Sequence, residues 1–156
     1  MGKRGPQSAA KKSAKQLPRS RAKRFPWDKK GLSRAERVIA FCEFLPITSG
    51  VHAGRKMNLR DWQKDIINGI YATDAAGLRM VRTGVITLPR KNGKTALCSM
   101  LELCHLLGPE AEQRGQCFSA GADREQAALI YNEMEAIILS VPEFAERCHI
   151  QSFHRT

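Results

Sequence analysis

Gly93, Lys94 and Thr95 are three consecutive residues whose types can together hold a phosphate chain. The glycine lets backbone N–H groups approach phosphate oxygens, and the lysine supplies a positive charge for the β and γ phosphates. The threonine hydroxyl can be a ligand of Mg²⁺. The complete pattern, a glycine, four residues and Gly-Lys-Ser/Thr, places a glycine where this chain has Leu88. Three of the four defined positions therefore match.

The residues before the tripeptide could complete a phosphate-binding loop. If Leu88 is the last residue of a strand, the turn begins at the following proline. The loop that would surround the phosphates then consists of Pro89, Arg90, Lys91, Asn92 and Gly93. Arg90 and Lys91 would add positive charge, and we take Lys94 and Arg90 as the candidate catalytic residues. A solvated loop cation is an equally good interpretation of Arg90.

The segments on both sides of this loop predict a parallel sheet. Residues 79–88 are rich in β-branched residues and end in an apolar run, which is typical of a buried parallel strand. Residues 95–107 are apolar on nearly all sides, which predicts a helix packed between layers. Residues 116–120 predict a second short strand. A strand, loop, helix and strand over about 35 residues have the size of a right-handed βαβ unit, so we expect an α/β fold.

Further helices are predicted from capping signals and helical periodicity. Ser33 followed by Glu36 is a capping box, and the helix that it starts should end near Leu45, before a proline. Residues 59–72 repeat apolar positions at helical spacing, and Asp123 is a good N-cap for a long amphipathic helix. Residues 141–148 indicate a turn or short helix, and residues 149–153 the start of a third strand.

The formal net charge of +11 is concentrated at the N-terminus. Residues 1–30 carry eleven Lys and Arg and one acid, a net +10, so the remaining 126 residues carry fifteen basic and fourteen acidic groups, a net +1. Residues 1–30 have too few apolar side chains to offset their ordering entropy, so we expect a disordered basic tail. A solvated tail without a target and salt-dependent contact with nucleic acid phosphates both fit this composition.

Membrane insertion and a metal centre are both disfavoured. No apolar run approaches the roughly 20 residues needed to span a bilayer, so we expect a soluble intracellular protein. The five cysteines form no Cys-x-x-Cys pair and are best interpreted as buried free thiols. A zinc site built from Cys98, Cys104 and His105 is unfavourable, because neighbouring Cys104 and His105 diverge on a helix.

Four segments together resemble the large terminase subunit of tailed bacteriophages, the ATP-driven motor that packs DNA into a procapsid. LPRKNGKT (residues 88–95) is similar to the family's deviant Walker A loop, in which a basic residue replaces part of the glycine-rich stretch. RVIAFCEFL (37–45), GRKMNLRDWQKDII (54–67) and CFSAGADREQAALIYNEM (117–134) agree with the family in order and spacing. The resemblance covers about residues 33–155 and implies a P-loop ATPase domain from residue 31 to 156.

The resemblance also suggests roles for residues outside the loop. Gln63 would read adenine, since its amide can both donate to and accept from the base edge. Trp62 could line the base pocket, although a core aromatic is the better interpretation. Gln126 is either a family position or a helix-surface glutamine. Arg124 and Arg147 are available as trans-acting arginine fingers, but no residue pattern supports either.

The implied cofactors are ATP and Mg²⁺, with Thr95 as the metal-binding residue. The implied partners are double-stranded DNA, the portal protein, the small terminase subunit and further copies in a ring, in the cytoplasm of the bacterial host. After residue 120 no apolar run ends in Asp-Glu, so the Walker B carboxylates are missing, and 156 residues leave no room for the family's nuclease domain. We therefore expect a fragment that binds nucleotide with little turnover.

Two other functions stay open at this point. Another P-loop DNA motor, such as a helicase-like ATPase, would share the loop and an upstream glutamine. A non-enzymatic fragment that holds DNA or a packaging subunit through its basic tail would also fit the charge distribution.

Overall fold

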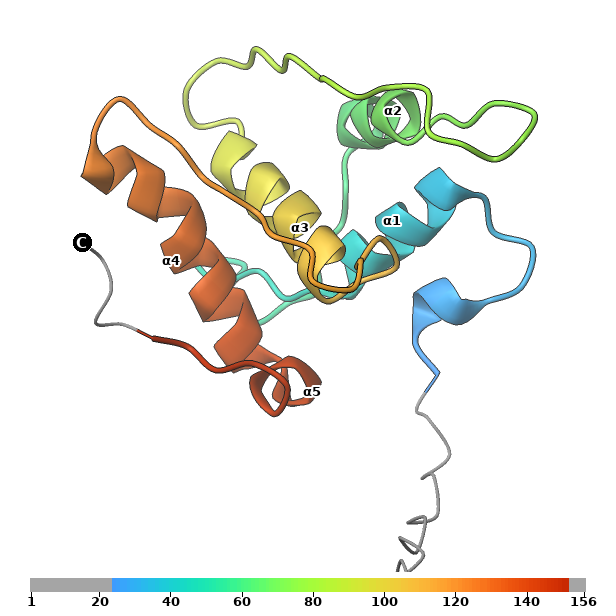
Figure 1. Cartoon of the computed structure of the whole chain (residues 1–156). Helices are drawn as coiled ribbons and strands as arrows, with labels where there is room; N and C mark the ends of the chain where they lie inside the picture. The colour runs from blue at the N-terminus through green and yellow to red at the C-terminus, as the bar shows by residue number, and fades with distance from the viewer. Residues whose placement is uncertain (1–23, 152–156) are drawn as a thin grey trace, which may run out of the picture.

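The structure is a computed structural model that describes residues 24–151, and within this range the chain is helical (Figure 1). The helical elements are η1 (Pro26–Asp28), α1 (Arg34–Phe44), α2 (Asp61–Ile70), α3 (Lys94–Leu106), α4 (Arg124–Ser140) and α5 (Pro142–Ala145). α3 packs against both α4 and α1, while α1 also contacts η1 and α2. None of the helices in this range is long and apolar enough to cross a membrane.

The helix starts agree with the capping signals of the sequence. At α1, the Ser33 hydroxyl accepts a hydrogen bond from the Glu36 N–H at 3.2 Å, and the Glu36 carboxylate accepts one from the Ser33 N–H at 2.7 Å. These bonds to the charged form lower the pKa of Glu36. At α4, the Asp123 carboxylate accepts from the Gln126 N–H at 2.8 Å. The predicted helices at residues 33–45, 59–72, 95–107 and from Asp123 onward are thus confirmed within a few residues.

The predicted parallel sheet is wrong for the part of the chain that the structure describes. Residues 81–90 and 116–120 are not in strands, and the described residues form only two isolated antiparallel bridges, Pro46 with Lys56 and Thr73 with Arg79. A strand exists only through hydrogen bonds to a neighbour, and neither segment makes a backbone hydrogen bond to another described segment. Val85, expected to be buried, is 90% exposed, and Phe118 of the second predicted strand is 83% exposed. The third predicted strand fails for residues 149–151, and its last residues lie outside the described range.

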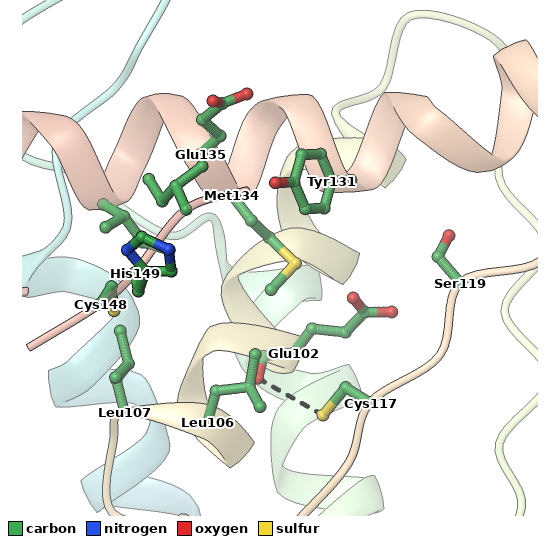
Figure 2. Close-up of a pocket in the computed structure, with 12 residues that line it drawn as sticks. Glu102, Leu106, Leu107, Cys117, Ser119, Tyr131, Met134, Glu135, Cys148 and His149 are labelled. Carbon is green, nitrogen blue, oxygen red and sulfur yellow. Dashed lines mark hydrogen bonds between the residues drawn. The ribbon is translucent and has the colours of Figure 1, made fainter. Parts of the chain in front are cut away.

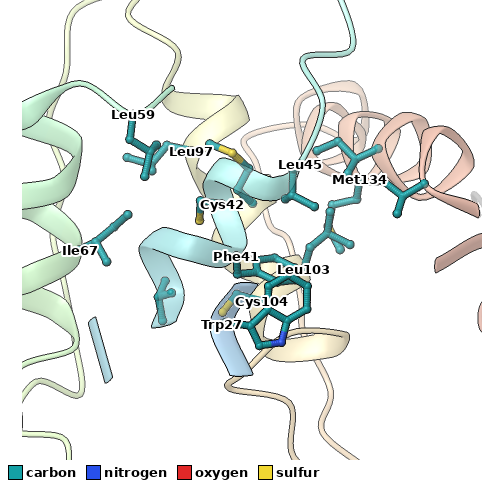
Figure 3. Packing of buried hydrophobic residues seen from close by; sticks show 14 of the residues in the cluster. Trp27, Phe41, Cys42, Leu45, Leu59, Ile67, Leu97, Leu103, Cys104 and Met134 are labelled. Carbon is teal, nitrogen blue, oxygen red and sulfur yellow. The ribbon is translucent and has the colours of Figure 1, made fainter. Parts of the chain in front are cut away.

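The core lies where η1, α1, α3 and α4 meet, with α2 on the other side of α1 (Figures 1 and 3). α1 contributes Val38, Phe41 and Cys42, and α3 contributes Leu97, Leu103 and Cys104. Burying one such large apolar side chain stabilises the fold by about 1.5–3 kcal/mol. Burial also raises the pKa of the Cys104 thiol to about 12, so it stays protonated and inert. All five cysteines are free.

An aromatic cluster attaches the beginning of the described chain to the core. Phe25 and Trp27 stack with ring centroids 4.5 Å apart, and Trp27 meets Phe41 edge-on at 4.9 Å. Phe41 also lies 6.0 Å from Phe144 of α5. Trp27 is 5% exposed, so this part of the predicted tail is packed against the core. The contacts of Phe25 and Trp27 hold this segment on the core although charged residues surround it. The rest of the predicted tail, residues 1–23, lies outside the described residues.

We predict opposite effects of alanine at two glycines. A Cβ added to Gly108 would lie 2.7 Å from the Phe41 ring and 2.9 Å from the Cys104 Cα, whereas one added to Gly69 of α2 meets nothing within 4 Å. Gly108→Ala should therefore lower the free energy of unfolding by about 1–3 kcal/mol through overpacking. Gly69→Ala should raise it by about 0.5–1 kcal/mol through helix propensity. Urea unfolding of both variants tests this, and equal effects would contradict the packing at Gly108.

Candidate functional site

The loop before α3 has the backbone shape of an anion-binding site. We call residues 89–95 the Gly-Lys-Thr loop. Gly93 is the N-cap of α3 with φ 71° and ψ 21°, and its carbonyl accepts the Leu97 N–H at 3.0 Å. Lys91 also has a positive φ, 66°, which is unfavourable for a residue with a side chain. Left-handed residues in such a loop turn successive N–H groups toward one side, where they can bind an anion.

The start of α3 adds to this attraction for anions. The first N–H groups of a helix have no partner inside the helix, and the helix dipole places partial positive charge at the same end. Among residues 24–151, no side chain caps this end of α3. Leu97, Met100 and Leu103 of α3 are buried in the core. Their packing fixes the direction of the helix and therefore the position of its N-terminus.

A hollow of about 720 Å³ lies beside this loop, and we call it the basic hollow. It is bounded by three parts of the chain: the α1–α2 loop (residues 45–60), the first turn of α2, and the Gly-Lys-Thr loop with the start of α3. Its lining residues are Ile47, Ser49, His52, Arg55, Lys56, Met57, Asn58, Arg60, Trp62, Gln63, Lys91, Asn92, Gly93 and Ala96.

The basic hollow brings together some of the residues that the sequence singled out. Gln63 lines it together with Lys91, Asn92 and Gly93, although about 30 residues separate them in the sequence. Trp62 lines it too and is half-buried. The remaining predicted residues do not line it. These residues, all exposed, are Pro89, Arg90, Lys94 and Thr95.

Lys94 is the first residue of α3, and its charge acts on a cysteine of the same helix. Its positive charge partly offsets the rise in the pKa of Cys98, one turn further on, that burial and Glu102 cause. Gln126, in the first turn of α4, is exposed and also lies outside the lining of the basic hollow. The basic hollow is therefore assembled mainly from Gln63 and the first half of the Gly-Lys-Thr loop.

Gln63 is held in place by the start of its own helix. Its side-chain oxygen accepts the Arg60 N–H at 2.9 Å, and the side chain is buried, with 8% of the residue exposed. This hydrogen bond uses the amide oxygen and leaves the NH₂ group for a ligand in the basic hollow. The sequence suggested that the amide would both donate and accept. In the structure a backbone N–H uses one of the two acceptor positions of this oxygen, so the NH₂ donors are the more available part of the amide.

Sequence reasoning missed the cationic side chains that the α1–α2 loop brings to the basic hollow. Arg55, Lys56 and Arg60 line it from this loop, and Lys91 lines it from the Gly-Lys-Thr loop. No Asp or Glu is among the lining residues. The density of basic residues in GRKMNLR (54–60), a few positions before Gln63, was the signal that could have identified them. The hollow is thus suited to a polyanion.

A second hollow, of about 430 Å³, has a different character (Figure 2). It lies between α3 and α4 and is lined by apolar side chains such as Leu106 and Met134. Its one carboxylate on α3, Glu102, has a pKa raised by burial. The Cys117 thiol donates a long hydrogen bond of 4.0 Å to the Glu102 carbonyl. None of the predicted site residues lines this apolar hollow.

Comparison with known proteins assigns the family. The family model for the ATPase domain of the terminase large subunit matches residues 61–152, more than half of the chain. The chain therefore belongs to the terminase large subunit family, within its ATPase domain. The resemblance found in the sequence is confirmed.

Two matches come from the same bacteriophage. The large terminase subunit of Enterobacteria phage HK97 is 40% identical over 120 residues, which are 76% of this chain and 23% of that protein. The crystal structure of the HK97 bacteriophage large terminase matches with a TM-score of 0.68 and 38% identity, covering 78% of this chain and 24% of that one. The chain thus spans about a quarter of the length of these relatives.

We predict that the side-chain oxygen of Gln63 stabilises the start of α2. Gln63→Glu keeps an acceptor for the Arg60 N–H and places a negative charge in the first turn of α2. Its free energy of unfolding should stay within about 0.5 kcal/mol of the original chain. Gln63→Ala removes the acceptor and should lower that free energy by about 1 kcal/mol. Chemical denaturation measures both, and equal losses would contradict the capping role.

Proposed function

We propose that this chain carries the ATP-binding part of a terminase motor. In the complete protein, ATP hydrolysis would drive double-stranded DNA into a procapsid. The observation that carries the proposal is the shared lining of the basic hollow, where Gln63 faces the loop of Lys91, Asn92 and Gly93. An adenine at the glutamine and phosphates at the loop would span this hollow, and membership of the terminase family supports the same ligand.

The phosphates would be held by backbone amides and by two lysines. The N–H groups at the start of α3 would donate to the phosphate oxygens, and Lys91 would add charge from inside the hollow. Lys94, which is exposed and has no ion pair within residues 24–151, would swing from the side of α3 to the β and γ phosphates. Arg90 would support it from the neighbouring turn, and Pro89 would start that turn.

Mg²⁺ fits the residues present only as a metal carried by the nucleotide. No cluster of three or more His, Cys, Asp or Glu in residues 24–151 could hold a metal by itself. Mg²⁺ commonly binds through one or two protein groups together with substrate phosphates, and the Thr95 hydroxyl stands at the right end of α3. When bound there, the metal would neutralise developing charge on the phosphates.

Membership of the terminase family supports a proposal for the partners. We propose that residues 31–156 act as the N-terminal portion of an ATPase domain in the cytoplasm of the bacterial host. The complete protein would act there as a ring with the portal protein and the small terminase subunit. The described residues that line the basic hollow include no carboxylate that could activate water, so we propose that this portion binds ATP but turns over little by itself.

The Lys94 role predicts a loss of ATP affinity on substitution. Lys94→Ala should weaken binding of ATP with Mg²⁺ by roughly 10- to 100-fold, because a hydrogen bond to a charged group contributes about 1.5–3 kcal/mol. Isothermal titration calorimetry on the full 156-residue chain measures this. Lys29→Ala removes another exposed lysine that does not line the basic hollow and should bind as the original chain does. Equal affinity of the Lys94→Ala variant and the original chain would remove Lys94 from the site.

A nucleotide in the basic hollow should change the fluorescence of one tryptophan. The chain has two, Trp62 at the hollow and Trp27 in the aromatic cluster. Stacking or close approach of adenine should quench Trp62, while buried Trp27 should not respond. Titration with ATP should therefore lower the emission of the original chain but not of Trp62→Phe. A similar decrease in both would place the nucleotide elsewhere.

A further inference from the structure

We propose that Arg55 binds the phosphate chain of the nucleotide from the wall opposite the Gly-Lys-Thr loop. This inference rests on the proposed function, since it needs a nucleotide in the basic hollow. It adds a residue that neither the phosphate-binding pattern nor the upstream glutamine includes. Arg55 comes from the α1–α2 loop and lines the same hollow as Lys91 and Gly93.

The backbone of Arg55 is fixed although its side chain is exposed. Its N–H donates to the His52 carbonyl at 3.1 Å, and its carbonyl accepts the Ile47 N–H at 2.8 Å. The Met57 N–H donates to the Leu45 carbonyl at 2.8 Å and extends this hairpin-like pairing. The guanidinium is therefore carried by an ordered turn, so a ligand would have to order only its side chain.

The α1–α2 loop is also tied to the other side of the molecule. The Thr48 hydroxyl donates to the Glu133 carboxylate of α4 at 2.6 Å. α4 packs against α3, whose first turn also lines the basic hollow. Both lining segments are thus positioned by α3, one directly and one through α4. Such fixed spacing is what a site needs to hold the two ends of one anion.

Among the basic side chains of the α1–α2 loop, Arg55 is the most available to bind a ligand. Among the other cations of this loop, the Lys56 ammonium lies 5.5 Å from the centroid of the Phe44 ring, which holds it toward the aromatic cluster. Arg60 is the N-cap residue of α2 and adjoins the glutamine end of the hollow. Within residues 24–151, Arg55 has no side-chain hydrogen bond or ion pair, and no carboxylate lines the hollow to neutralise it.

The chemistry of the group selects phosphate rather than base or ribose. A guanidinium presents five N–H donors in a planar fork that matches two phosphate oxygens at once. The glutamine end of the hollow already supplies a donor and an aromatic ring for a base. A further cation in the hollow would interact with the extra negative charges of a di- or triphosphate. It would add less affinity for a nucleoside monophosphate, which carries fewer charges.

The experiment compares ATP, ADP and AMP on the full chain by calorimetry. Arg55→Ala should weaken ATP binding by about tenfold or more, while AMP binding changes less than about twofold. Arg55→Lys keeps the charge but loses the fork and should recover part of the affinity. Arg24→Ala, an exposed arginine outside the basic hollow, is the matched control and should bind ATP as the original chain does. Thermal unfolding should stay unchanged in all three variants, because these side chains are exposed.

The outcomes separate this inference from the proposed function. If Lys94→Ala loses ATP affinity but Arg55→Ala does not, the Arg55 inference is overturned and the nucleotide site stands. An equal loss for ATP and AMP would overturn a phosphate contact as well. If Arg55→Ala instead lowers affinity for double-stranded DNA and leaves ATP binding intact, the α1–α2 loop serves DNA. If the original chain binds no ATP, both proposals fail.

Discussion

The packing of α3 is the constraint on which the candidate site depends. Its apolar side chains are buried against α1 and α4, so the direction of the helix and the position of its first turn are set by the core. The N-terminal amides and the helix dipole then point out of the packed body at Gly93. Apolar packing thus sets where the partial positive charge of the helix N-terminus lies, and no buried charged residue is needed for this.

The other parts of the basic hollow reach it through elements that are themselves tied to α3. α1 packs on α3 and leads into the α1–α2 loop, and the Thr48–Glu133 hydrogen bond joins that loop to α4. α2 contacts α1 and presents Gln63, whose oxygen is used to begin the helix. A ligand in the basic hollow would touch all of these segments. Its binding would therefore stabilise the arrangement of several helices together.

Local signals in the sequence predicted the helices well, and the strands poorly. The capping box at Ser33 and the N-cap at Asp123 act over three residues, so the sequence alone determines them. A strand needs a partner segment, and the apolar run at Val85 carries no information about which segment that is. Trp27 also shows that long-range contacts cannot be read from local sequence, in this case for a residue that is buried. Its charged neighbours suggested a tail, while its contact with Phe41 across the fold buries it.

The candidate site was predictable in the same uneven way. The Gly-Lys-Thr loop and Gln63 were visible because residue type and spacing mark them. The cations of the α1–α2 loop were not, because their position depends on hairpin-like pairing and on contact with α4. The exposed positions of Lys94 and Thr95 outside the lining of the basic hollow also could not be read from the pattern. Type and spacing identify candidate ligands, but long-range packing decides which of them face one hollow.

Several acidic side chains in this part of the chain make structural contacts away from the basic hollow. Glu110 is buried against Arg34 at 2.7 Å, Glu43 pairs with Lys64 at 2.9 Å, and Glu133 is bonded to Thr48. These carboxylates stabilise contacts between elements, and none of them lines the basic hollow, whose charged lining residues are basic. A carboxylate placed there would repel the phosphate chain unless a metal or a bound nucleotide shielded it. The described lining of the basic hollow therefore favours a polyanion and supplies no carboxylate of its own to activate water.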